Sequence, residues 1–202
     1  MSRLDIAWIR GRFAGHRPEV ISAELAPRRA AVASIFRASD GQSSPELLFI
    51  RRAQHEQDPW SGHMAFPGGR VEQRDLSPLD AARRETWEEV RIDLARTGEL
   101  VGQMDDIMAS ARGRMIGMAI TPYVFVLSDP VLPRRNRSEV EEVLWVPVGT
   151  LLDPASASTV PYELAGQRYE LPCFQIQGRT IWGLTYQMLR QMFVVLEWES
   201  GR

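Results

Sequence analysis

The chain has 202 residues, of which 44% are hydrophobic and 25% are charged, and a formal net charge of −2. This composition fits one globular domain and excludes intrinsic disorder as the main state. The near-neutral charge supplies no field that would attract nucleic acid, and no apolar run approaches the roughly 18 residues of a membrane span. The first residues lack the apolar stretch of a signal peptide, and the single cysteine, Cys173, cannot form an internal disulfide. A cytoplasmic protein without nucleic-acid or membrane partners is therefore expected.

Apolar runs and turn clusters along the chain predict an α/β fold. Residues 1–28 have apolar positions at roughly helical spacing and are expected to form a leader helix of the same domain as residues 29–202. Compact apolar runs predict strands over residues 29–37, 47–52, 63–66, 99–104, 120–127 and 143–148. Helices are predicted over residues 77–90 and 180–198, with a short one near Leu151. Loops are predicted over residues 129–137 and 153–170, apart from a strand over 168–171.

The helix over residues 77–90 has its start signal in the sequence. Ser77 is a suitable N-cap, Pro78 fits the first helical position, and Asp80 stands three residues after the cap. This is a capping-box arrangement, with Asp in place of the usual Glu. The pattern therefore places the first turn of the helix directly after Ser77.

Three glutamates of this helix would share one face, because Glu85, Glu88 and Glu89 stand at positions i, i+3 and i+4. Two like charges about 4 Å apart repel by about 4 kcal/mol at an effective dielectric constant of about 20. Water relieves that repulsion on an exposed face, whereas in a pocket a cation must do so. Carboxylate oxygens in this number suit Mg²⁺, or Mn²⁺ in its place.

A glutamate-rich helix face is most often a solvated surface, so the neighbouring residues decide between the two interpretations. The Gly68-Gly69 turn and the acidic residue Asp75 precede the capped helix, and Arg84 directly precedes Glu85. Arg84 can hold a carboxylate in a fixed rotamer through a salt bridge. This combination favours a metal site over a solvated surface.

The segment from Gly69 to Ile92 resembles the Nudix box, written G-x5-E-x7-R-E-U-x-E-E-x-G-U, where U is an aliphatic residue. The matching positions are Gly69, Arg84, Glu85, Glu88, Glu89 and Ile92. The segment also departs from the pattern: Asp75 replaces the first Glu and is separated from the Arg by eight residues rather than seven, Thr86 replaces the aliphatic residue, and Arg91 replaces the last glycine. The Arg-Glu pair and both later glutamates are intact, so an active site is expected.

The resemblance implies an α/β/α sandwich with a mixed β-sheet, and a Mg²⁺-dependent hydrolase of nucleoside diphosphate derivatives. The catalytic residues that it implies are Arg84, Glu85, Glu88, Glu89 and Glu139. The implied metal ligands are Glu85, Glu88, Glu89 and the backbone carbonyl of Gly69. Glu88 and Glu139 are alternatives for the general base, and the resemblance does not decide between them.

Substrate phosphates need cations close to the metal site, and arginine suits bidentate phosphate contacts. Arg51 and Arg52, at the end of a predicted strand, are the first candidates, and Arg112 and Arg114 are the second. Trp60 is a candidate to stack on a substrate base, because its loop is polar and lies next to the box.

Three further stretches resemble the coenzyme A pyrophosphatase branch of the Nudix hydrolases: Gly62-x-x-x-Phe66-Pro-Gly-Gly, Glu139-Val-Glu-Glu-Val-Leu-Trp145-Val-Pro and Ile181-Trp182-Gly-Leu-Thr185. They imply cleavage of coenzyme A or acyl-coenzyme A to 3′,5′-ADP and (acyl-)phosphopantetheine. The branch's upstream pattern matches residues 47–52 only loosely, and the loop that follows is longer. Two alternatives therefore stay open: a Nudix hydrolase of ADP-ribose, NADH or a nucleotide sugar, and a non-catalytic module that senses a nucleotide.

The predicted C-terminal helix carries large apolar side chains, among them Met188, Met192, Phe193 and Trp198. A face that joins two copies in a homodimer and a face turned to the core explain these residues equally well.

Overall fold

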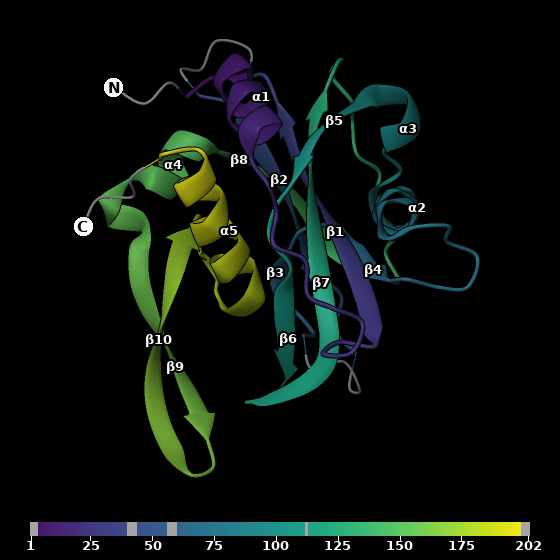
Figure 1. Cartoon of the computed structure of the whole chain (residues 1–202). Helices are drawn as coiled ribbons and strands as arrows, with labels where there is room; N and C mark the ends of the chain where they lie inside the picture. Colours follow the sequence, from purple (N-terminus) through teal and green to yellow (C-terminus); the bar gives the residue numbers. More distant parts are fainter. Residues whose placement is uncertain (1–3, 40–43, 56–59, 112, 199–202) are drawn as a thin grey trace.

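A computed structural model describes residues 4–39, 44–55, 60–111 and 113–198 of the protein (Figure 1). The helices are α1 (Ile6–Gly15), α2 (Pro78–Val90), α3 (Leu94–Thr97), α4 (Val148–Leu152) and α5 (Gly183–Val195), with a 3₁₀ turn over Pro154–Ser156. The strands are β1 (Arg28–Arg37), β2 (Glu46–Arg52), β3 (Met64–Ala65), β4 (Gly68–Arg70), β5 (Gly98–Gln103), β6 (Ile107–Ala111), β7 (Arg114–Leu127), β8 (Val140–Pro147), β9 (Ala157–Leu164), β10 (Gln167–Ile176) and β11 (Arg179–Ile181).

Eight strands form one mixed sheet, with the order β3-β2-β1-β7-β5 along its main path. Off this path, β4 pairs with β1, β6 with β7 and β8 with β2. β1 and β7 run parallel, from Arg28 opposite Met118 to Phe36 opposite Val126, whereas the other pairs are antiparallel. Most of β1 and the second half of β7 are buried, so this parallel pair lies at the centre of the sheet.

Helices cover both faces of this sheet. In Figure 1, α2 and α3 lie on one side of the strands, and α1 and α5 lie on the other. Each side has its own apolar cluster, because successive strand residues point to opposite faces: Phe36 belongs to the cluster with Met192 of α5, and Ile35 belongs to the cluster with Val90 of α2. The predicted α/β/α sandwich with a mixed sheet is confirmed.

The predicted start of α2 is also confirmed. The side chain of Ser77 accepts a hydrogen bond from the backbone N–H of Asp80 at 3.2 Å, and Pro78 occupies the first turn. This cap satisfies one of the N–H groups that a helix start leaves without an internal partner.

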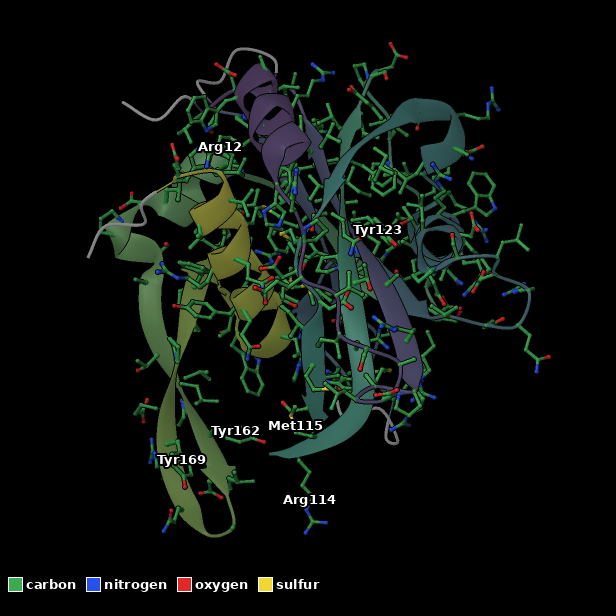
Figure 2. The ribbon with its side chains drawn as sticks, viewed as in Figure 1. Arg12, Arg114, Met115, Tyr123, Tyr162 and Tyr169 are labelled. Carbon is green, nitrogen blue, oxygen red and sulfur yellow. The ribbon has the colours of Figure 1, made fainter. Side chains whose placement is uncertain are left out.

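The loop predicted over residues 153–170 is wrong, because most of this segment is β-structure. β9 and β10 pair antiparallel from Ala157 opposite Phe174 to Leu164 opposite Gln167, and β11 completes a three-stranded sheet. The hairpin of β9 and β10 extends away from the rest of the fold (Figure 1), and Figure 2 labels Tyr162 and Tyr169 along it. Few residues of β9 and of the first half of β10 are buried, so the sequence there lacks the apolar pattern of a packed strand.

Other predicted boundaries shift for local reasons. The last helix begins at Gly183 and not at residue 180, because Arg179–Ile181 form β11 and Gly183 adopts a φ of +62°. β7 begins at Arg114, before the predicted strand, because its first residues pair with β6. The leader helix is shorter than predicted, since residues 16–27 contain no helix.

The large apolar side chains near the C-terminus face the core. Met188, Met192, Phe193 and Trp198 each have at most 4% of their surface exposed. The core interpretation of this helix is therefore correct, and these four side chains offer no surface to a second copy. None of the helices in the described ranges has the length and apolar content to cross a membrane.

Candidate active site

Helix α2 lies close against β1 because the side chains at their contact are small. Ala81 and Ala82 of α2 pack with Ala31 of β1 in a cluster of their own. Glu85 and Glu89 follow Ala81 by one and two helical turns, so they lie on the same face of the helix. The close packing therefore carries both carboxylates to the neighbouring strand β4, which pairs with β1.

Two glycines allow the backbone of β4 to approach this face. A Cβ atom at Gly69 would lie 2.4 Å from Oε1 of Glu85, and one at Gly68 would lie 2.2 Å from the carbonyl oxygen of Ala31. Gly68 also has a φ of +150°, which other residues rarely adopt. Glycine is therefore the residue that fits at both positions.

Glu89 is almost completely buried, with 3% of its surface exposed. Its Oε2 accepts a hydrogen bond from the backbone N–H of Gly68 at 2.9 Å, and its Oε1 lies 3.9 Å from Nη1 of Arg52. Burial is the main reason that the pKa of Glu89 is raised to about 8. The contacts with Gly68 and Arg52 oppose this rise, whereas the charges of Glu85 and Glu139 add to it.

Glu85 shares this environment. Its side chain is 17% exposed, and burial raises the pKa of its carboxyl group, with the charges of Glu88 and Glu139 adding to the rise and Arg84 opposing it. Burial and neighbouring negative charges thus disfavour the ionised forms of both Glu85 and Glu89. A bound cation would remove this penalty for both.

Arg84 holds the carboxylates around it in place. Its Nε and Nη2 donate to the two oxygens of Asp75, each at 2.9 Å, and its Nη1 donates to Oε1 of Glu85 at 2.9 Å and to Oε2 of Glu88 at 3.1 Å. Nη2 also donates to the carbonyl oxygen of Arg70 at 3.0 Å. The bond with Arg84 is the main reason that the pKa of Asp75 is lowered. Asp75, the shorter acid in the box, therefore positions Arg84.

Glu88 and Glu139, the two alternatives for the general base, lie in different surroundings. Glu88 is held by Arg84 and by Nη2 of Arg74 at 3.1 Å. Glu139 lines the same cavity as Glu85 and Glu89, and its Oε1 accepts a hydrogen bond from Nδ2 of Asn136 at 3.2 Å.

A cavity of about 650 Å³ opens beside the carboxylates of Glu85 and Glu89. Its polar part includes Arg52, Gly68, Gly69, Glu85, Glu89 and Glu139. Its apolar part, from β3, β7, α5 and their neighbours, includes Met64, Phe66, Met118, Ile120, Leu184 and Met188. A cavity of this size fits a small organic ligand, and its two parts suit a ligand with a charged group and a less polar arm.

The donor set fits a Mg²⁺ ion. Across the described ranges, no three His, Cys, Asp or Glu side chains gather closely enough to form a complete metal site. Mg²⁺ needs only one or two carboxylates from the protein when substrate phosphates and water supply the other ligands. Glu85 and Glu89 provide two, and the burial that raises the pKa of each favours a cation beside them.

The structure brings together only some of the residues predicted to bind substrate. Arg52 and Trp60 line the cavity. Arg51 is directed to Glu141, with Nε 3.4 Å from Oε2, and Arg114 is exposed at the far end of β7 (Figure 2). Arg112 lies outside the described residues.

The structure explains two departures from the Nudix box. Thr86 is fully buried, and its hydroxyl donates to the carbonyl oxygen of Ala82 at 2.7 Å, so the polar atom has a partner within the helix. Arg91 follows the helix with a φ of 58°, the left-handed conformation for which the box has glycine. Arg91 also lies over the ring of Trp87, 5.6 Å from its centroid.

Sequence reasoning missed several residues of the cavity. Arg70 and Glu72 line it, and their place one and three residues after Gly69 was a usable signal. His63 and Trp182 line it as well, with ring centroids 4.8 Å apart. These two are 119 positions apart in the sequence, so no local pattern could have joined them.

Comparison with known proteins gives the family. A family model of the NUDIX domain matches residues 27–164. The chain belongs to the Nudix family. The prediction of a Nudix hydrolase is therefore confirmed at the level of the family.

Similar curated proteins include a Nudix hydrolase. An uncharacterized Nudix hydrolase, NudL, from Salmonella heidelberg is 30% identical, and the match covers 95% of this chain and 94% of that protein. An uncharacterized protein of Schizosaccharomyces pombe is 37% identical, and this match covers 63% of the chain but only 44% of the relative. Among solved structures, a MutT/nudix family protein from Enterococcus faecalis has a TM-score of 0.54 at 15% identity, over 94% of this chain and 68% of that one, which supports the fold alone.

Proposed function

We propose that this protein is a Mg²⁺-dependent pyrophosphohydrolase that cleaves the diphosphate of coenzyme A or acyl-coenzyme A, with 3′,5′-ADP and (acyl-)phosphopantetheine as products. The observation that carries the proposal is the pair of the buried Glu89 and the half-buried Glu85 against the Gly68-Gly69 backbone, at the polar end of a cavity of ligand size. The single cysteine, Cys173, supports action in the reducing cytosol.

In this proposal, Glu85 and Glu89 hold Mg²⁺, or Mn²⁺ in its place, with the Gly69 carbonyl and Glu88 as further candidates. Held there, such an ion would neutralise charge on the diphosphate and would lower the pKa of a water molecule. Arg84, fixed by Asp75, keeps Glu85 in its rotamer. Arg52, beside Glu89, binds a substrate phosphate.

The attacking water needs a base to take its proton. We assign this role to Glu139, because it lines the cavity and its charge adds to the raised pKa of both Glu85 and Glu89. Glu88 remains the alternative, although Arg74 and Arg84 hold its carboxylate. Water attack on one phosphorus breaks the bond between that phosphorus and the bridging oxygen, and the leaving phosphate departs on that oxygen.

The coenzyme A assignment is supported by the three stretches that resemble that branch and by the composition of the cavity. All three stretches contribute to the cavity wall, with Phe66 from the first, Glu139 from the second and Trp182 from the third. The diphosphate would lie at the glutamates, and the less polar pantetheine arm would lie along Met118, Ile120 and Met188.

Product analysis by mass spectrometry tests this assignment. Purified protein with Mg²⁺ is offered coenzyme A, ADP-ribose, NADH and diadenosine polyphosphates in parallel, with Glu85→Gln as the inactive control. We expect 3′,5′-ADP and phosphopantetheine from coenzyme A and little product from the other compounds. Preferred cleavage of ADP-ribose or NADH would overturn the choice of substrate. Absence of product from every compound would instead favour the non-catalytic module.

A further inference from the structure

A second hollow, of about 570 Å³, lies beside the end of α2. Its lining residues are Trp87, Arg91, Leu132, Arg134, Arg135, Asn136 and Arg137. Within the described part of the chain, none of these residues lines the catalytic cavity. Four of the seven are arginines and none is acidic, although the whole chain has a net charge of −2. The hollow therefore concentrates positive charge on an otherwise slightly acidic protein.

The loop between β7 and β8 that carries three of these arginines is held by its backbone. The N–H of Arg134 donates to the carbonyl oxygen of Val90, and the N–H of Asn136 donates to that of Glu89, each at 2.8 Å. These bonds satisfy carbonyl groups at the C-terminal end of α2. The loop is thus fixed without the use of its guanidinium groups.

The guanidinium groups of this loop have few partners in the protein. Arg134 and Arg137 are exposed and form no ion pair with any side chain in the described ranges. Arg135 acts weakly on Glu142, whose pKa is lowered chiefly by Arg179 and in smaller part by Arg135. Arginines gathered around one hollow repel one another, and an anion bound among them would relieve that repulsion.

Apolar surface lies beside the arginines. Trp87 has 48% of its surface exposed, and Leu132 has 86% exposed. Guanidinium groups match phosphate oxygens in bidentate pairs, and an exposed indole offers a flat face to an organic group. The combination suits a phosphate ester better than a bare inorganic anion.

We propose that this hollow binds a small phosphate ester, with the phosphate on Arg134 and Arg137 and the organic part against Trp87. This site is separate from the proposed catalytic function and does not depend on it. The size of the hollow is within the usual range for small-molecule sites.

Calorimetry with adenosine 5′-monophosphate tests the proposal, with EDTA present to prevent metal-assisted binding in the catalytic cavity. The double variant Arg134→Glu/Arg137→Glu should weaken binding at least tenfold. The matched control is Arg17→Glu/Arg96→Glu, which reverses the charge of two exposed arginines outside both hollows and should stay within twofold of the wild type. If charge reversal destabilises the fold, Arg134→Gln/Arg137→Gln replaces it, with the same expectation.

Four outcomes would overturn the proposal. An equal loss in the control variant would show a general charge effect, and unchanged binding in the loop variant would place the ligand elsewhere. Binding of a poly-glutamate peptide through the same arginines, without binding of the nucleotide, would make the hollow a protein-docking site. Substrate turnover separates this proposal from the catalytic one: the loop variant should keep its turnover, and a parallel loss would contradict a separate site.

Discussion

Single residues decide how closely the metal-binding face of α2 can approach the sheet. At Gly69 the space that a methyl group would need is taken by the carboxylate of Glu85. At Arg91 the helix ends in a conformation that costs a residue with a side chain roughly 1 kcal/mol or more relative to glycine. Gly69 is therefore needed for the geometry of the site, whereas the conformation of Arg91 lowers the stability of the fold.

Gly69→Ala should abolish most of the activity while the protein stays folded. The added methyl group would displace Glu85, so we expect turnover to fall at least 100-fold. Gly11→Ala is the control, since nothing lies within 4 Å of a Cβ there; it should leave turnover unchanged and stabilise α1 by about 1 kcal/mol. Steady-state kinetics and thermal unfolding report both effects. Full turnover in Gly69→Ala would mean that Glu85 does not need its present position.

Arg91→Gly should stabilise the protein by about 0.5–1 kcal/mol. Glycine removes the strain of the left-handed conformation, and the loss of the contact between Arg91 and Trp87 offsets part of this gain. Urea unfolding measures the free energy difference. A destabilised variant would show that the contact with Trp87 outweighs the strain.

At the scale of elements, one buried carboxylate fixes the segment after α1 to the sheet. Asp106 has a fully buried side chain that pairs with Arg29 at 2.5 Å and accepts hydrogen bonds from the N–H of Ile21 and the hydroxyl of Thr121. These bonds join the segment after α1, which contains Ile21, to β1 and β7. Removal of one partner of a buried pair leaves the other charge without compensation.

Asp106→Ala should therefore lower the free energy of unfolding by about 3 kcal/mol. Asp105→Ala is the matched control, because the side chain of Asp105 is 33% exposed and pairs with His16. Its removal should lower the free energy of unfolding by less than about 1 kcal/mol. Chemical unfolding of the two variants measures the difference. Equal costs would contradict the anchoring role of Asp106.

Most elements with a buried face could be predicted from the sequence, but β6, in which Ile107 and Ala109 are buried, and the exposed strand β9 were not predicted. The core strands and α2 have apolar patterns or caps that local rules detect. β9 has little buried surface, so its pairing with β10 depends on backbone bonds that no residue pattern reveals. In the same way, Glu85 and Glu89 could be predicted from their spacing, whereas Trp182 and His63 meet only through the tertiary fold.

At the scale of the whole molecule, the raised pKa of the buried Glu89 should make the free energy of unfolding depend on pH. The pKa of Glu89 is about 8 in the folded protein against an ordinary 4.5. A raised folded pKa contributes stability below pH 4.5, and this stability is lost as the pH rises towards 8. Without metal, the wild type should thus lose stability over this range relative to Glu89→Gln. Urea unfolding at pH 5 and pH 8 in EDTA tests this, and parallel pH profiles would contradict it.

The most direct test of the account is the turnover of the preferred substrate by Glu89→Gln. The comparison uses saturating Mg²⁺, the wild type and Glu99→Gln, which removes a carboxylate that is 45% exposed on β5. If Glu85 and Glu89 form the catalytic metal site, Glu89→Gln should lose at least 100-fold in kcat, and Glu99→Gln should remain within twofold of the wild type. Wild-type kcat in Glu89→Gln would contradict the assignment of the active site to this face of α2.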